Sequence, residues 1–199
     1  MPDSRPPVGA EALALRPHPV EAAPLDLTVA VRVLGPAHDG HWHLHYTLSG
    51  AIDLLRLPAL TTAGPADELW RHTCMEAFVQ DADGPAYREF NFSPSGQWAA
   101  YRFRTERARE PDGPPPAQGP DIRVEHGPRT LTVRVRLPRV LLPDQPGVMG
   151  LTAVIETRDG AVSHWALHHP RPERPDFHHI GGWTHRPPRP QSPSALPSA

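Results

Sequence analysis

Two neighbouring stretches decide the fold: Trp70-Arg-His-Thr-Cys-Met-Glu76-Ala-Phe-Val79 and Tyr87-Arg-Glu-Phe-Asn-Phe-Ser-Pro-Ser-Gly96-Gln-Trp-Ala-Ala-Tyr-Arg-Phe103. Residues 73–80 alternate, which predicts a strand. Its core face would carry Met75, Ala77 and Val79, and its other face Cys74, Glu76 and Phe78. Residues 87–92 and 97–105 predict a hairpin around Ser93-Pro-Ser-Gly96, because proline in second place and glycine in fourth suit a type I turn.

The rest of the chain repeats this pattern of short strands and turns. Strands are expected at 12–16 (an edge strand), 25–33, 42–48, 52–57, 122–125, 131–137, 149–157, 163–168 and 176–183. Asp159-Gly160 signals a further hairpin, and no segment has the period of a long helix. The sequence therefore predicts an all-β fold, an antiparallel β-sandwich of jelly-roll or immunoglobulin-like type. We expect one domain over residues 10–184, with disordered tails at 1–9 and 185–199.

Composition excludes several classes of partner. All 20 basic residues of the 199 are arginine, and the formal net charge is −2, so nucleic acid and anionic membranes are not expected partners. No apolar run approaches the roughly 20 residues of a membrane span, and the first residues do not resemble a secretory signal. We therefore expect a cytoplasmic protein. Cys74 is the only cysteine and is interpreted as a small buried hydrophobe.

The predicted hairpin places candidate binding residues together. If Ser93 and Gly96 flank a two-residue turn, Asn91 lies opposite Trp98, and residues 89 and 87 lie opposite 100 and 102. One face would then carry Tyr87, Glu89, Asn91, Trp98 and Arg102, with Glu76 joining from the preceding strand. The core face would carry Phe90, Phe92, Ala99, Tyr101 and Phe103.

The chemistry of that first face suits a polyhydroxylated ligand. Carboxylate, amide and guanidinium groups form paired hydrogen bonds with vicinal hydroxyls, and an indole stacks on the apolar face of a sugar ring. The alternative is a solvated outer sheet face, on which Trp98 covers aliphatic stems.

Four stretches carry a resemblance to a known family. They are Leu69–Phe78, Tyr87–Phe103, Gly150–Glu156 and Trp165–Pro170 with Pro175–His179. As a set they resemble the DOMON-like proteins and, more distantly, the family-nine carbohydrate-binding modules. The resemblance implies a β-sandwich that binds a small ligand.

The resemblance to the carbohydrate-binding modules also implies roles for individual residues. Trp70 matches one tryptophan of an aromatic clamp, Glu76 a carboxylate that binds hydroxyls, and Asn91 an amide on the next strand. Trp165 is the candidate for the second clamp tryptophan. Where those modules carry arginine two residues before the amide, this sequence has Glu89.

Metal and haem binding are the alternatives. Other DOMON relatives bind haem through methionine and histidine, and Met75 with a C-terminal histidine would imitate that, although alternation places Met75 in the core. His168, Asp176, His178 and His179 are candidate ligands for Zn or Fe(II), as carrier or as metal-dependent enzyme. The other interpretation of this group is that its histidines anchor a loop. His41, His43 and His45 share one strand face, where His-x-His spacing could chelate a metal; the alternative is a solvated polar face.

The sequence favours binding over catalysis. It has no glycine-rich phosphate loop, no Gly-x-Ser-x-Gly elbow and no His-Glu-x-x-His motif. Glu76 and Glu89 could form the carboxylate pair of a glycosidase, but nothing in the sequence sets their separation. The prediction is a non-catalytic module without a cofactor, whose ligand is a saccharide.

Overall fold

The computed structural model describes residues 11–21, 26–35, 37, 40–111, 113, 114 and 116–187. Its strands are β1 (Leu13–Pro17), β2 (Leu27–Leu34), β3 (Trp42–Gly50), β4 (Gly64–Pro65), β5 (Cys74–Asp81), β6 (Tyr87–Phe92), β7 (Gln97–Phe103), β8 (Asp121–His126), β9 (Thr130–Leu137), β10 (Pro146–Glu156) and β11 (Val162–Ala166). Its helical turns are η1 (Ile52–Leu54), η2 (Leu69–Arg71), η3 (Arg139–Leu141) and η4 (Ile180–Gly182). The predicted all-β fold is confirmed.

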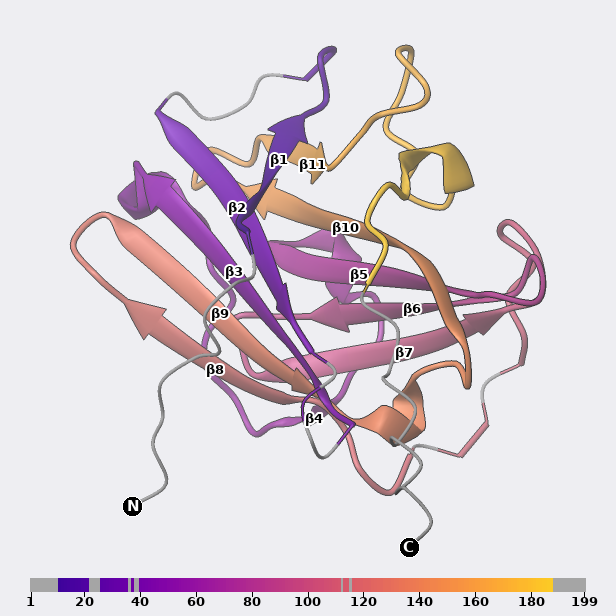
Figure 1. Ribbon diagram of the computed structural model, residues 1–199. Coiled ribbons are helices and arrows are strands. Elements are labelled where there is room, and N and C mark those ends of the chain that lie inside the picture. Colours follow the sequence, from indigo (N-terminus) through magenta and orange to yellow (C-terminus); the bar gives the residue numbers. More distant parts are fainter. Residues whose placement is uncertain are drawn as a thin grey trace, which may run out of the picture.

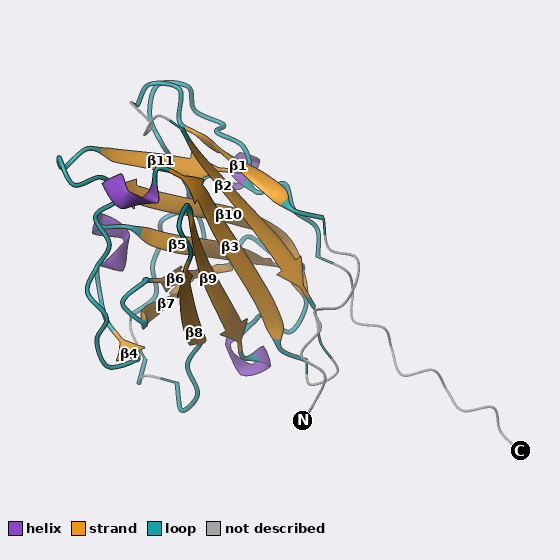
Figure 2. Ribbon diagram, turned by 90° about the vertical axis from the view of Figure 1, so that its left-hand side faces the viewer, coloured by secondary structure: helices purple, strands orange, loops and turns teal. Residues whose placement is uncertain are grey.

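The strands form two layers joined through one strand. The order is β4-β7-β6-β5-β10-β11-β1-β2-β3-β9-β8, and every pair is antiparallel except β4 with β7. Strand β1 belongs to both layers, because residues 13–15 pair with β2 and residues 16–17 pair with β11. Figure 1 shows β2, β3, β9 and β8 side by side, across from β10, β5, β6 and β7. We call these the first and second sheets; in Figure 2 the strands of one sheet overlap those of the other.

The main core lies between the sheets and follows from side-chain alternation. Residues of β2, β3 and β9 that point inward meet those of β5, β6 and β10, as two packed sheets require. Met75 is fully buried in this core, as predicted. One buried hydrogen bond crosses the layers: the Tyr46 hydroxyl on β3 donates to the Glu76 carbonyl on β5 at 2.7 Å. This bond therefore ties the second sheet to the first at Glu76, one of the candidate binding residues.

Three strand predictions are wrong. Residues 52–57 begin with the helical turn η1, and residues 176–183 contain η4. Strand β1 is central to the chain of pairings and not an edge strand. Residues 176–183 instead lie across the outer face of the second sheet, where Trp183 packs against Phe78. Strand propensity does not reveal such a tertiary contact.

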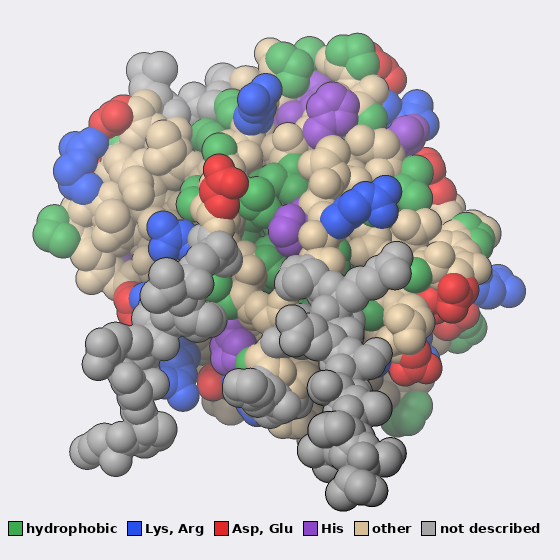
Figure 3. Space-filling model, in the orientation of Figure 1, with side chains coloured by type: hydrophobic (Ala, Val, Ile, Leu, Met, Phe, Trp, Pro, Cys, Tyr) green, Lys and Arg blue, Asp and Glu red, His purple; other side chains and the backbone are tan. Residues whose placement is uncertain are grey.

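The predicted tails lie almost entirely outside the described residues, which exclude 1–10 and 188–199. At the C-terminal boundary, His185 still pairs with Met149, whose N–H donates to the His185 carbonyl at 2.8 Å. Among the residues that the structure describes, no helix has the length and apolar character of a membrane span. The surface in Figure 3 mixes arginine, acidic and histidine side chains.

Candidate functional site

The outer face of the second sheet carries acidic and aromatic residues side by side. Glu76 lies opposite Asn91, and Phe78 lies opposite Glu89. Glu89 in turn lies opposite Tyr101 on β7. Because opposed residues point to the same face, these five side chains all point away from the main core. The predicted grouping of Glu76, Glu89 and Asn91 on one face is confirmed.

Trp98 and Arg102 do not belong to this face, so that part of the prediction is wrong. Trp98 lies opposite Phe92, and Arg102 lies opposite Arg88. The strands close at Ser93 and Gln97, where the Ser93 N–H donates to the Gln97 carbonyl at 2.9 Å. The loop therefore has three residues and not two. A shift of one residue moves every later side chain to the other face of the sheet.

The glycine of that loop explains the closure. The Gly96 N–H donates to the Ser93 carbonyl at 3.0 Å, so the predicted turn is present. Gly96 then adopts φ +91°, which suits the left-handed residue of a three-residue hairpin. This shift puts Tyr101 and Phe103, predicted as core, on the face that carries Glu89.

Trp165 also lies away from the site. It pairs with Ala153, and both belong to the main core. Its indole N–H donates to the Ser163 hydroxyl at 3.0 Å. The prediction of a second clamp tryptophan at this position is wrong, and its neighbour His164 instead lines the site.

A cavity of about 590 Å³ covers this outer face. Its walls come from β5, β6, β7, β10 and β11, from η2, and from the segments at 107–109 and 175–178. It is lined by Glu21, Trp70, Glu76, Phe78, Glu89, Tyr101, Phe103, Arg107, Arg109, Val154, His164, Pro175, Phe177 and His178. Its volume is within the range of small-molecule sites.

Aromatic side chains form much of the wall. Phe78, Tyr101 and Phe103 belong to a second hydrophobic cluster against which Phe177 packs. Trp70 lies on η2 and is 47% exposed, whereas the other four tryptophans, Trp42, Trp98, Trp165 and Trp183, are at most 6% exposed. Trp70 is thus the tryptophan whose indole is open at the cavity, and its role in binding stays a prediction.

Two buried carboxyl groups line the cavity from the second sheet. Glu76 is 2% exposed and Glu89 5% exposed. The Thr152 hydroxyl donates to Glu76 Oε2 at 3.2 Å. Burial, followed by the charge of Glu89, raises the pKa of Glu76 well above its usual range. Burial raises the pKa of Glu89 to about 7, against the opposing effects of Asn91, Arg109 and Arg107.

Asn91 holds Glu89 in place. Its side-chain amide donates to Glu89 Oε1 at 2.8 Å, and Asn91 is fully buried and does not line the cavity. The thiol of Cys74, also fully buried, lies 3.9 Å from Asn91 Oδ1. Asn91 is therefore a positioning residue for a carboxylate, and Cys74 is the buried residue that was predicted.

His178 lies between Tyr87 and Glu89 at the cavity wall. The Arg107 backbone N–H donates to the Tyr87 hydroxyl at 3.1 Å, and that hydroxyl lies 2.7 Å from His178 Nδ1. Burial lowers the pKa of His178 to about 4. The His178 ring is therefore neutral near pH 7, and its Nε2 lies 3.6 Å from Glu89 Oε2.

The two arginines of the cavity are held from outside it. Arg107 forms an ion pair with buried Asp176 at 2.6 Å. The Arg109 guanidinium lies over the Tyr101 ring, 3.9 Å from its centroid. The Tyr101 hydroxyl donates to Asp67, and the charge of Arg109 helps to lower the pKa of that acid.

The predicted metal ligands are not brought together. Asp176 pairs with Arg107, Arg171 and Arg174, and His179 accepts a hydrogen bond from the Gly181 N–H. His168 is exposed. Over the described part of the chain, no group of three or more His, Cys, Asp or Glu is arranged to hold a metal ion. The contacts of Asp176 and His179 support the alternative interpretation, in which these residues anchor a loop.

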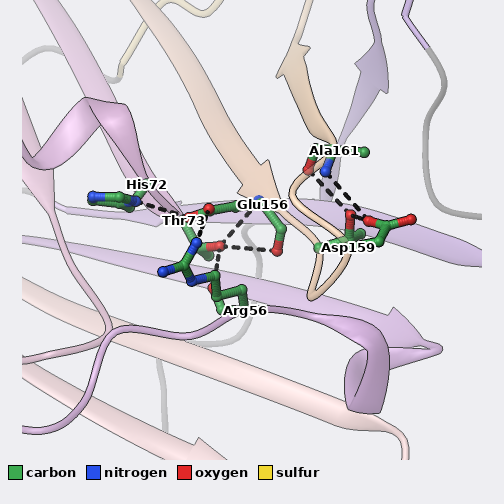
Figure 4. A network of polar contacts seen from close by, with 7 residues as sticks. Arg56, His72, Thr73, Glu156, Asp159 and Ala161 are labelled. Atoms are coloured by element: carbon green, nitrogen blue, oxygen red, sulfur yellow. Dashed lines mark hydrogen bonds and ion pairs between the residues drawn. The ribbon is translucent and has the colours of Figure 1, made fainter.

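A second polar network anchors the loop that carries Trp70. Figure 4 shows Arg56 and His72 converging on Glu156, at the end of β10. Each donates to one carboxylate oxygen at 2.8 Å. The Thr73 hydroxyl donates to the Arg56 carbonyl at 2.8 Å. Both ends of the 56–72 segment are thereby tied to the second sheet.

Sequence reasoning missed several residues of the cavity, chiefly Glu21, Tyr101, Phe103, Arg107, Arg109, His164 and Phe177. A three-residue hairpin would have predicted Tyr101 and Phe103, because it is the other common closure that uses a glycine. Nothing in the pattern of the remaining residues signals their place, since they reach the cavity through loops or through sheet pairing.

Comparisons with known proteins agree with this fold. No protein-family model matches the sequence, and no curated protein matches it significantly. Among solved structures, a proposed carbohydrate-binding protein from Bacteroides uniformis is similar, with a TM-score of 0.58 and 16% identity over 88% of this chain and 84% of that one. A family 9 carbohydrate-binding module from Caldicellulosiruptor kristjanssonii, solved with glucose, has a TM-score of 0.50 and 11% identity over 80% and 75%. At these identities the likeness concerns the fold, a β-sandwich that this chain shares.

Proposed function

We propose that this protein is a non-catalytic module that binds a saccharide in the cavity on the outer face of the second sheet. One observation carries the proposal: an exposed tryptophan, Trp70, and buried carboxyls, Glu76 and Glu89, line the same cavity. Indole and phenyl faces pack against the C–H face of a sugar ring. Carboxyl oxygens accept hydrogen bonds from its hydroxyls.

The fold supports the same proposal. The two similar sandwiches are described as a proposed carbohydrate-binding protein and as a carbohydrate-binding module in complex with glucose. The resemblance of the sequence to DOMON-like proteins adds the expectation of a small ligand. The size of the cavity, about 590 Å³, fits one or two sugar rings.

Isothermal titration against a panel of mono- and disaccharides tests the proposal. We expect saturable binding by the wild-type protein and a loss of roughly tenfold in affinity for Trp70→Ala, since a specific aromatic contact contributes about 0.5–1.5 kcal/mol beyond the area that it buries. Leu60→Ala is the matched control, because Leu60 is 78% exposed in the same loop but does not line the cavity. Equal affinities in the two variants would place the site elsewhere, and no binding to any sugar would refute the proposal.

A further inference from the structure

The acids and bases around the cavity are unevenly matched. Arg107 is paired with Asp176 at 2.6 Å, and the Arg109 charge acts on Asp67. At the opposite wall, Glu21 accepts a hydrogen bond from His164 at 2.8 Å. Each of these charged groups thus has a partner of opposite sign or a hydrogen-bond donor. We call Glu76 and Glu89, which reach the cavity from the second sheet, the floor carboxyls.

The two floor carboxyls have no such cation in contact. Within the described chain, the hydrogen-bond partner of the Glu76 carboxyl is the Thr152 hydroxyl. Glu89 meets an amide, Asn91, and the neutral ring of His178. Arg107 and Arg109 line the same cavity, but their charges do not offset the burial of Glu89. Two buried carboxylates without a cation are unfavourable, so in the empty cavity the pair retains protons near neutral pH.

A ligand cation would take the place of those protons. An ammonium group has three donors and no acceptor, so it matches oxygens that are ionised, whereas a hydroxyl is equally satisfied by a protonated acid. The surrounding walls are rings of Phe78, Tyr101 and Phe103, and aromatic faces attract a desolvated cation. The floor therefore combines both features that recognise a buried amine.

We propose, building on the proposed saccharide function, that the ligand is an amino sugar whose ammonium group lies between Glu76 and Glu89. Binding then releases protons from this pair to solvent. A neutral sugar of the same shape fits the same walls but leaves the protons in place. The preference for the amine and the release of protons are two separate consequences of one arrangement.

The test compares glucosamine, glucose and N-acetylglucosamine by isothermal titration at pH 6, where the amine of glucosamine is already protonated. Titrations in two buffers of different ionisation enthalpy measure the protons released by the protein. We expect glucosamine to bind roughly severalfold more tightly than either neutral sugar, because the gain from hydrogen bonds to a charged group is partly offset by the proton that must leave Glu89, whose pKa of about 7 lies above the working pH. Its binding enthalpy should change between buffers in the sense of proton release, and that of glucose should not.

Glu76→Gln keeps the shape of the side chain and an oxygen that can accept from Thr152, but removes the charge. We expect the ratio of glucosamine to glucose affinity to fall to about one in this variant, and to persist in Leu60→Ala. Equal wild-type affinities for glucosamine and glucose, or a buffer-independent enthalpy, would overturn the amino-sugar proposal and leave saccharide binding intact. Failure of glucosamine, glucose and N-acetylglucosamine alike to bind would instead overturn the proposed saccharide function.

Discussion

Replacing Glu89 with glutamine is expected to change how stability depends on pH. Burial raises the pKa of Glu89 from 4.5 to about 7, so between these values the folded protein holds a proton that the unfolded chain has lost. Stability due to this group is therefore fully present below pH 4.5 and is lost as pH rises through 7. At roughly 1.4 kcal/mol per pH unit, that interval corresponds to a loss on the order of 3 kcal/mol.

His178 has the opposite effect and must be separated. Burial lowers its pKa from 6.5 to about 4, so its contribution is unfavourable at low pH and improves as pH rises through the same interval. The contributions of Glu89 and His178 therefore partly offset each other in the wild-type curve. The difference between wild type and Glu89→Gln removes the His178 contribution and isolates that of Glu89.

Urea denaturation at pH 4.5, 5.5, 6.5 and 7.5 measures this difference. The free energy of unfolding of wild type relative to Glu89→Gln should fall by about 3 kcal/mol from the lowest to the highest pH. Asp83→Asn, a substitution in the exposed turn after β5, is the control and should give a small, constant difference. A Glu89 difference that is constant with pH, or that grows, would refute the assignment of a buried carboxyl that resists ionisation.

Three further substitutions test the scaffold by chemical denaturation. Tyr46→Phe removes the buried hydrogen bond to the Glu76 carbonyl and should reduce stability by about 1–2 kcal/mol; no loss would mean that the bond between the sheets contributes nothing. Gly50→Ala should destabilise by roughly 3 kcal/mol or more. Gly50 has φ +124°, and a Cβ there would lie 1.7 Å from the Asp26 carbonyl oxygen. Normal stability of this variant would show that the turn adapts. Asp176→Asn should destabilise by roughly 2 kcal/mol at neutral pH. Because the pKa of Asp176 is lowered, the difference in stability from wild type should shrink as pH falls through the usual aspartate range. A difference independent of pH would contradict the ion pairing.

Alternation was sufficient to predict most of the sandwich. In β2, β3 and β9 every second residue is buried, because one face of each strand meets the opposite sheet. In β5 both faces are buried over residues 74–79. The Asp159-Gly160 hairpin is also as predicted: Gly160 lies in the turn at φ +87° between β10 and β11.

The site could be predicted only in part, and the reason is register. Glu76, Glu89 and Asn91 were grouped correctly from strand period alone. Trp98 and Arg102 were misplaced because Pro94–Gly96 closes the hairpin with three residues, a choice that the turn sequence does not dictate.

The remaining walls depend on tertiary contacts that no local pattern encodes. The turn at Arg107 has φ +58°, and its backbone N–H reaches the hydroxyl of Tyr87. The segment at 175–178 is held through Asp176 by arginines from two regions of the chain. The contact between Arg107 and Asp176 joins residues 69 positions apart, so composition and periodicity do not reveal it.

Acrylamide quenching of tryptophan fluorescence tests the central claim most directly. Trp70 is 47% exposed and the other tryptophans are at most 6% exposed, so quenching reports on the edge of the cavity. With a saturating saccharide identified by titration, we predict that quenching falls toward the level of the buried tryptophans. Saturable binding that leaves the quenching unchanged would contradict the placement of the ligand in this cavity.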